Sequence, residues 1–460
     1  MTPQDPSSLY NSFRSWFGES VLIKLFLIGV LTLILLIPSV AIQDLIRERQ
    51  ARQEEATSEI SDKWSGKQEV AGPVMVLPYK TTIGTRDTTG KMTYREAITN
   101  ICILPEVLNI KSNASPEVLH RGIFDAVVYN STVSFSGKFA PLELKKSGIN
   151  PAMIQWDKAR LVVGVSDLKG LRSNPAIRLG KHTYEVEPDF SPLKLFDNNL
   201  MIMPGLLPEE GTSLPFSFNL NLRGSSALSF VQLGKTTTAT LSGNWNNPKF
   251  IGRTLPDNRN ITSGTFRASW NLPYFSRPFP QQWIQENTAS KILNEEAAFG
   301  VEFILPVDQY QKTMRSAKYS MLIILLSFIA LIFTELLTKR KVHLLQYILI
   351  GAAMIIYYTL LLSFSERWGF SIAYLIASIA TVTLITSFIT ALLRNKKASL
   401  VFGSILAVFY SFIYVIIQLQ DLALLFGSIG LFIITAVLMY LSAKIDLYKR
   451  SLPQDEAAVS

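Results

Sequence analysis

The sequence predicts a membrane protein with a six-span α-helical bundle and a large extracytoplasmic, antiparallel β-rich domain of sandwich-like architecture. A membrane span needs about 20 mostly apolar residues. Six runs of the 460-residue chain qualify: Val21–Ile42, Tyr319–Leu337, Leu345–Phe364, Phe370–Leu393, Ala398–Ile417 and Leu422–Ala443. Residues 57–294 instead have the composition of a soluble protein and are numerous enough for one large domain or two smaller ones.

We expect five segments along the chain. These are a cytoplasmic lead with the first span (1–42), a helical stalk (43–69), the β-rich domain (70–310), a five-helix bundle (311–446) and a cytoplasmic tail (447–460). Two interpretations of the first apolar run compete, because Arg14, Lys24 and Ser39–Ala41 also resemble a cleavable signal peptide. We favour an uncleaved anchor, since the run has full spanning length and continues into a plausible helix.

The stalk prediction rests on charge spacing in Gln43–Lys63. Glu48 and Arg52, like Glu59 and Lys63, are four residues apart, which favours a helix. Gly66 and the pair Gly72–Pro73 are predicted to end it.

Alternating apolar and polar residues predict strands with one buried face in the next region. The pattern recurs in Val133–Gly137, Phe216–Leu220 and Thr265–Trp270. One stretch, Gln281–Ala298, is instead predicted as a helix before the last strand.

Loop charges predict the orientation. Positive residues, which stay in the cytoplasm, follow the second, fourth and sixth spans: Lys339–Lys341, Arg394 with Lys396 and Lys397, and Lys444 with Lys449 and Arg450. The alternate connections carry only Arg367 or no positive residue. We therefore expect a multi-pass protein of the bacterial inner membrane, with both termini cytoplasmic and the β region outside.

Catalytic and metal-binding patterns are absent from the sequence. The three histidines, His120, His182 and His343, have no metal-ligand spacing, and the single Cys102 excludes a disulfide framework or a multi-thiolate site. Gly234–Thr236 resembles the end of a phosphate loop, but Ser229 stands where that motif needs glycine. Three Asn-x-Ser/Thr triplets, beginning at Asn113, Asn130 and Asn260, match a glycosylation pattern that is common by chance. We expect no enzyme activity, no cofactor, no metal and no nucleic-acid partner.

Polar residues within and beside the bundle are the candidate functional positions, because charge in lipid is costly and usually functional. Glu335 is predicted to pair with Lys339, one turn further on. The complete set is Glu335, Gln346, Glu366, Gln418, Gln420, Asp421 and Asp446. Small residues at Ala373, Ala377 and Gly403 favour close helix packing.

The chain resembles the CreD family of bacterial inner-membrane proteins. The closest matches are Lys341–His343 with Gln346–Tyr347, Leu361–Glu366, Ala373–Ala377, Gln418–Ser428, Lys444–Tyr448, Gly72–Tyr79, Leu222–Ser225 and Leu233–Lys235. The chain departs from the family pattern W-P-H-P-x-F-x-G at Trp245–Gly252, and Leu447 replaces a usual tryptophan. The resemblance implies a role in cell envelope integrity and envelope stress, and it supplies no known reaction.

Two functional hypotheses follow, with the lipid bilayer as a partner in both. In the first, the β domain binds an envelope protein, a lipid or cell-wall material. In the second, the bundle transports or handles lipid, along a polar path through Glu335, Gln346 and Gln418. An unrecognised enzyme of wall or lipid metabolism stands behind both.

Overall fold

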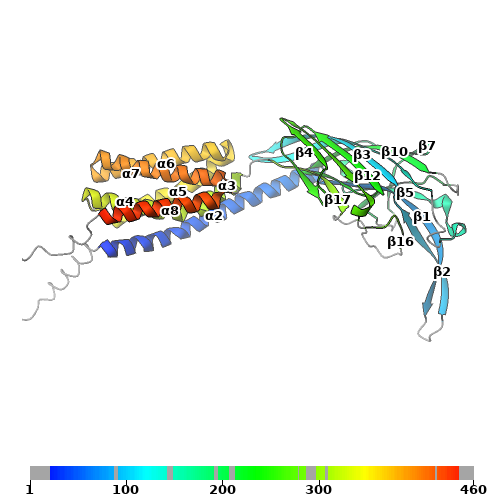
Figure 1. Ribbon diagram of the computed structural model, residues 1–460, viewed down its shortest axis with the longest axis horizontal. Helices are drawn as coiled ribbons and strands as arrows, with labels where there is room; N and C mark the ends of the chain where they lie inside the picture. The colour runs from blue at the N-terminus through cyan, green and yellow to red at the C-terminus, as the bar shows by residue number, and fades with distance from the viewer. Residues whose placement is uncertain are drawn as a thin grey trace, which may run out of the picture. The chain divides into compact units, whose positions relative to one another are not determined.

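The computed structural model describes residues 21–86, 92–141, 149–190, 195–206, 213–277, 279–285, 297–305, 309–419 and 422–444. The chain divides into two compact units (Figure 1). One unit comprises Met1–Arg52 with Val307–Ser460, and the other comprises Gln53–Pro306.

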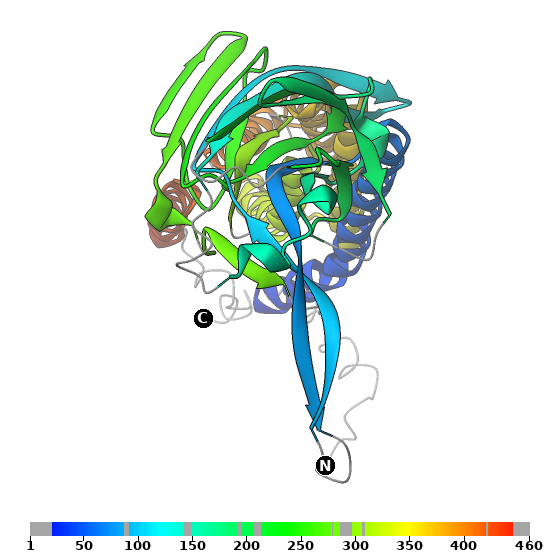
Figure 2. The same cartoon turned by 90° about the vertical axis from the view of Figure 1, so that its right-hand side faces the viewer.

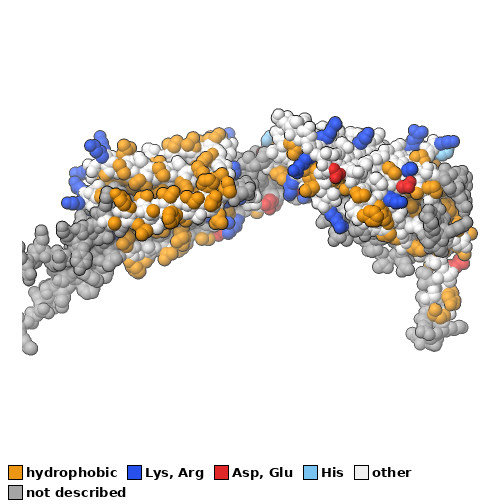
Figure 3. Space-filling view, viewed as in Figure 1, with side chains coloured by type: hydrophobic (Ala, Val, Ile, Leu, Met, Phe, Trp, Pro, Cys, Tyr) orange, Lys and Arg blue, Asp and Glu red, His pale blue; other side chains and the backbone are white. Residues whose placement is uncertain are grey.

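The first unit is a helical bundle. Its helices are α2 (Val21–Trp64) as far as Arg52, α3 (Gln309–Lys318), α4 (Ser320–Thr338), α5 (Leu344–Trp368), α6 (Phe370–Leu393), α7 (Lys396–Gln418) and α8 (Ala423–Lys444). Within the described residues, all of these except α3 are long and apolar enough to cross a membrane, which confirms the six predicted spans. Hydrophobic side chains cover most of the visible bundle surface (Figure 3), as a lipid-facing surface requires.

Small residues allow the bundle helices to approach one another closely. A Cβ atom on Gly403 of α7 would lie 2.4 Å from the hydroxyl oxygen of Thr386 on α6. Ala373 and Ala377 of α6 are fully buried. The packing role predicted for these residues is confirmed.

Helix α2 combines the first span with the stalk. Its 44 residues correspond to about 66 Å at the standard helical rise, well beyond the bilayer core. The pairs Arg52–Glu48 and Lys63–Glu59 form ion pairs one turn apart, as their spacing predicts. Gly72 and Pro73 do not end the stalk, because they lie inside the first strand, where the pairing register shifts between Ala71 and Val74.

The second unit contains two β-sheets. Its strands are β1 (Gln68–Arg86), β2 (Met92–Ile103), β3 (Val107–Arg121), β4 (Phe124–Phe139), β5 (Arg160–Val165), β6 (Ala176–Leu179), β7 (His182–Glu185), β8 (Glu187–Asp189), β9 (Asn198–Ile202), β10 (Leu214–Ser225), β11 (Ala227–Val231), β12 (Thr236–Gly243), β13 (Pro248–Gly252), β14 (Asn258–Thr262), β15 (Thr265–Leu272), β16 (Gln282–Gln285) and β17 (Ala298–Phe303).

The larger sheet runs β13-β17-β11-β1-β5-β9-β8, and β2 and β16 extend it from β1. The second sheet runs β14-β15-β12-β3-β4-β10-β6-β7. Figure 2 shows the two-stranded ribbon of β1 and β2 projecting from the unit. Most pairings are antiparallel, as predicted, but β1–β11 and β12–β3 are parallel, so both sheets are mixed.

The two sheets pack face to face around one core, so the sandwich-like prediction is confirmed. Phe135 of the eight-stranded sheet stacks on its neighbour Phe218 at 4.8 Å and meets Phe230 of the other sheet edge-on at 6.0 Å. Trp270 and Phe299 meet across the same interface at 5.4 Å. Each such buried aromatic contributes roughly 1.5–3 kcal/mol of burial free energy.

Two local predictions have different outcomes. The helix predicted over Gln281–Ala298 is wrong where the structure describes it, because Gln282–Gln285 forms β16 against β2. Cys102, expected as a small apolar strand residue, is buried in β2, and burial raises the pKa of its thiol to about 12.

Candidate functional site

Glu335 of α4 lies in a polar cluster at one end of the bundle. Lys24 of α2 donates hydrogen bonds to its carboxylate and also to the carbonyl oxygen of Val342, at 2.9 Å. The hydroxyl of Tyr347 on α5 donates to Glu335 Oε2 at 3.2 Å. The ion-pair partner is therefore Lys24 on the first span, and the predicted pairing with Lys339 is wrong.

Glu366 and Gln418 are both bound by the short helix α3. The hydroxyl of Tyr310 donates to Glu366 Oε1 at 3.0 Å, and Lys312 Nζ donates to Gln418 Oε1 at 3.0 Å. Gln418 in turn donates from Nε2 to Ser371 Oγ at 3.3 Å. Burial first, and then the neighbouring Glu366 carboxylate, raise the pKa of the Tyr310 hydroxyl, which therefore stays a donor.

The other predicted polar positions take part in neither cluster among the described residues. Gln346 caps helix α5, where its Oε1 accepts from the backbone N–H of His343 at 2.8 Å. Gln420, Asp421 and Asp446 lie outside the described residues.

The two clusters lie at opposite ends of α5. Tyr347 and Glu366 are 19 positions apart on that helix, which corresponds to about 29 Å. Between them, the ring of Tyr357 contacts the rings of Tyr358, Tyr374 and Tyr410 at centroid distances of 4.8–5.9 Å. The predicted residues thus form two separate sets of helix contacts around an aromatic layer.

A groove of about 650 Å³ runs between α6 and α7. Its lining is mainly apolar, with hydroxyl groups interspersed: Ser371, Ile372, Tyr374, Leu375, Ser378, Ile379, Val382, Thr383, Ala407, Tyr410, Ser411, Tyr414 and Val415. This composition suits an acyl chain.

A second group of polar side chains, separate from those of the bundle, covers the outward face of the eight-stranded sheet. Over most of their length, β3, β4, β10, β12 and β15 alternate between mainly apolar residues in the core and mainly polar residues facing outward. The outward positions are dominated by asparagine, serine and threonine, among them Asn109, Asn113, Ser115, Thr132, Ser134, Ser136, Ser217, Asn219, Asn221, Thr236, Thr238, Thr240 and Ser242. We call this surface the polar face.

The strand register aligns these side chains in rows. Asn113 lies opposite Thr132 on one side and Ser242 on the other. The row continues from Thr132 to Asn221 of β10 and from Ser242 to Arg267 of β15. Residues directly opposite on neighbouring strands have side chains close enough to act together.

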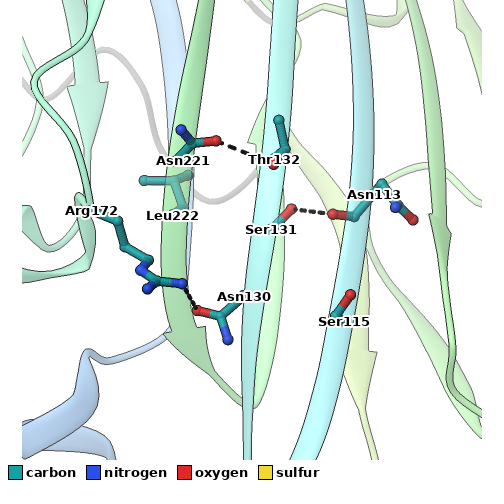
Figure 4. A pocket seen from close by; sticks show the side chains of 8 residues that line it. All are labelled: Asn113, Ser115, Asn130, Ser131, Thr132, Arg172, Asn221 and Leu222. Carbon is teal, nitrogen blue, oxygen red and sulfur yellow. Dashed lines mark hydrogen bonds between the residues drawn. The ribbon is translucent and has the colours of Figure 1, made fainter.

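A groove of about 380 Å³ lies on the polar face, and Figure 4 shows the side chains that line it. It is lined by Asn113, Ser115, Asn130, Ser131, Thr132, Arg172, Asn221 and Leu222. Arg172 Nη1 donates to Asn130 Oδ1 at 3.1 Å, and Thr132 Oγ1 donates to Asn221 Oδ1 at 3.2 Å. These contacts hold the two amide groups in place, one from a neighbouring strand and one from the loop that carries Arg172.

Arg172 reaches the groove because a one-turn helix at Leu168–Gly170 directs the chain back onto β10. Asp167 caps that turn by accepting from the backbone N–H of Lys169 at 3.0 Å. The backbone N–H of Arg172 then donates to the carbonyl of Asn221 at 3.0 Å. Although burial alone would raise the pKa of Asp167, donation from the N–H groups of Lys169 and Gly66 and from the Ser65 hydroxyl lowers it.

A second groove of about 540 Å³ adjoins the first and shares Asn113 and Ser115 with it. Its lining is Asn113, Ala114, Ser115, Ser242, Gly243, Asn244, Asn260, Thr262, Thr265, Phe266 and Arg267. Among the described residues that line the two grooves, the charged side chains are Arg172 and Arg267, and none is acidic. We call the two adjoining grooves the polar band.

The sequence offered one signal for this band. All three Asn-x-Ser/Thr triplets contribute lining residues, at Asn113, Asn130 and Asn260. In the sequence alone they match only a glycosylation pattern that is common by chance, because the distance between them hides that the strands bring them to one face.

Comparison with known proteins covers both units. A family model described as inner membrane protein CreD matches residues 20–448. Inner membrane protein CreD of Escherichia coli (strain K12) is 30% identical over 429 residues, which are 93% of this chain and 93% of that protein.

Proposed function

This chain belongs to the CreD family of inner membrane proteins, and on that premise we propose that it is a membrane-anchored binding protein of the cell envelope. In this proposal the bundle holds the chain in the inner membrane, and the polar face binds an envelope component without chemical turnover. Binding there contributes to envelope integrity and to the response to envelope stress.

The observation that carries the proposal is the polar band. Its residues come from strands β3, β4, β10, β12, β14 and β15, so the fold assembles it from segments far apart in sequence. Its hydrogen-bonding groups and two arginines face outward, whereas the polar groups of the bundle bind one another. An open polar surface on a rigid sheet is suited to recognising a polar ligand.

The orientation follows from loop charge. Positive residues follow α4, α6 and α8, and positive loops favour the cytoplasmic side. In this proposal those helix ends and both termini are therefore cytoplasmic, and the β unit is outside. Reporter fusions after residues 305 and 395 test it: an enzyme that needs export should be active only at the first position.

A charge-reversal pair tests the binding role in cells. Arg172→Glu with Arg267→Glu places acid at both ends of the polar band, while Arg178→Glu makes the same change on exposed β6, outside both grooves. After crosslinking in cells and purification, the double variant should lose envelope material that the control variant retains. Equal recovery from both variants would count against the proposal. So would cells carrying the double variant that tolerate surface-active agents as well as cells carrying the control variant.

A second candidate function, lipid handling, is favoured by the groove between α6 and α7. Ala407→Trp would fill that groove, and Val408→Trp makes the same change at a neighbouring lipid-exposed position outside it. Lipid movement in reconstituted vesicles that is blocked only by Ala407→Trp would support this function. No lipid movement by the unaltered protein would remove it.

A further inference from the structure

We propose that the ligand of the polar band is an acidic glycan strand, meaning a chain of sugar rings that carries carboxylate groups. This inference rests on the proposed binding function and specifies the chemistry of the same surface. Length, hydrogen-bonding polarity and charge support it independently.

The length of the band suits a polymer. It crosses the strand order β10-β4-β3-β12-β15-β14, which contains five inter-strand steps. At about 4.8 Å a step, the band extends for about 24 Å across the sheet. A single small molecule would fill one of the two grooves, whereas an extended strand of several sugar rings would occupy both.

The amide groups make the band rich in donors. The Oδ1 atoms of Asn130, Asn221 and Asn113 already accept from Arg172, Thr132 and Ser242, respectively. Each asparagine therefore has its side-chain N–H groups left for a ligand, apart from one bond from Asn221 to Ser173. Glycan ring oxygens, hydroxyls and acetamido carbonyls are acceptors that such groups bind.

The charges select acidic ligands. Arg172 and Arg267 line opposite grooves of the band, and the outward side chain of Lys111 lies on the central strand β3. Arginine binds carboxylate with paired hydrogen bonds, which gives both affinity and orientation. With no acidic side chain among the described lining residues, the band attracts anions along its whole length.

Other macromolecules fit less well. Single-stranded nucleic acid needs exposed aromatic platforms, and the one aromatic side chain among the described lining residues of the polar band, Phe266, is buried. A stable protein partner needs an apolar centre ringed by polar groups, whereas this surface is polar at its centre. The remaining anionic source, a phosphate polymer, lacks hydroxyl and acetamido groups for the asparagine row.

Binding to the full-length chain in lipid nanodiscs tests the proposal. The probes are a hyaluronan hexasaccharide, which alternates carboxylate and acetamido sugars, hexa-N-acetylchitohexaose (below, chitohexaose), which has acetamido groups without carboxylates, and sodium polyphosphate. We expect the hyaluronan fragment to bind most tightly, since only it meets both the arginines and the amides. Equal binding of chitohexaose, or tighter binding of polyphosphate, would overturn the proposal.

Two variants separate charge from hydrogen bonding. Arg172→Glu with Arg267→Glu should weaken hyaluronan binding by about tenfold or more, given two charge-assisted contacts, while Arg178→Glu leaves it within about twofold. Asn113→Leu should weaken the binding of both glycans more than that of polyphosphate, whose affinity depends mainly on the arginines. Variants that all bind hyaluronan like the unaltered chain would contradict the inference.

A photo-crosslinker at Asn113 in cells distinguishes a failure of the glycan inference from a failure of the proposed binding function. If the crosslinker captures a protein or lipid and the glycan probes do not bind, the glycan inference is wrong and the binding function of the polar face stands. If the crosslinker captures nothing and the glycan probes do not bind, both the glycan inference and the proposed binding function are wrong.

Discussion

The polar side chains of the bundle and those of the eight-stranded sheet differ in what they bind. In the bundle, Glu335, Glu366 and Gln418 are each held by another helix, through Lys24, Tyr310 and Lys312. On the sheet, asparagine oxygens are held by neighbours, while their N–H groups, apart from one bond from Asn221 to Ser173, are left for a ligand. In this chain, a polar side chain of the membrane-spanning bundle therefore indicates a contact between helices. The exposed amide groups of the sheet are the stronger candidates for ligand binding.

The difference has a physical cause. A polar group in the bilayer must find a partner within the protein, because lipid offers none. A polar group on a sheet facing water needs no such partner, so a concentration of them at strand spacing remains available to a ligand. Substitutions should therefore affect stability in the bundle and binding on the polar face.

The largest expected effect is at the Lys24–Glu335 pair. Glu335→Ala leaves the partly exposed ammonium group of Lys24 without its counter-ion, and the loss of this charge-assisted contact costs about 2 kcal/mol. The thermal unfolding midpoint in detergent should fall clearly below that of Leu337→Ala, a change at an exposed position of the same helix. Lys24→Ala combined with Glu335→Ala should recover part of the loss, and a double variant less stable than the single one would contradict this.

A smaller effect, dependent on pH, is expected at Asp167. Its pKa is lower in the folded chain than its ordinary value of 3.8, so ionised Asp167 stabilises the fold at neutral pH, and that stabilisation is lost as pH falls below about 4. Asp167→Asn should cost about 1 kcal/mol at pH 7, because a charged acceptor becomes a neutral one.

Denaturant unfolding at pH 7 and at pH 3 measures this effect. The stability difference between the unaltered chain and Asp167→Asn should shrink at the lower pH. A difference that stays constant or grows would show that the capping carboxylate does not act as described.

A third, comparable effect is expected at the contact between α3 and α5. Tyr310→Phe removes the hydrogen bond to Glu366 and should destabilise the docked helix α3 by about 1 kcal/mol. Hydrogen exchange of the α3 amides should accelerate accordingly. Tyr319→Phe is the matched control, since no hydrogen bond of its hydroxyl is found among the described residues, and equal acceleration in both variants would contradict the assignment.

The smallest effect on stability is expected on the polar face. Asn113→Ala alters an exposed side chain on β3, so the free energy of unfolding should change by less than about 0.5 kcal/mol. Ligand binding should nevertheless weaken in the same variant. A large loss of stability in the denaturant titration would show that Asn113 is structural, and the contrast between the two regions would fail.

Local patterns predicted much of this fold. Apolar runs located all six spans, and alternation in Phe216–Leu220 placed Phe216 and Phe218 in the core and Ser217 and Asn219 outward. Contacts distant in sequence were not predictable from such patterns. Lys24 and Glu335 are 311 positions apart, and the parallel pairing of β12 with β3 brings Ser242 beside Asn113 without any local signal. The polar band depends on several such pairings at once.

The central claim is that the polar band on the polar face binds an envelope component, and site-specific photo-crosslinking in cells tests it most directly. A photo-reactive residue at Asn113 lies in the polar band, and one at Ser217 points outward from the same sheet beyond both grooves. We predict a covalent adduct with envelope material at Asn113 and little or none at Ser217. No adduct at Asn113, or equal adducts at both positions, would contradict the account.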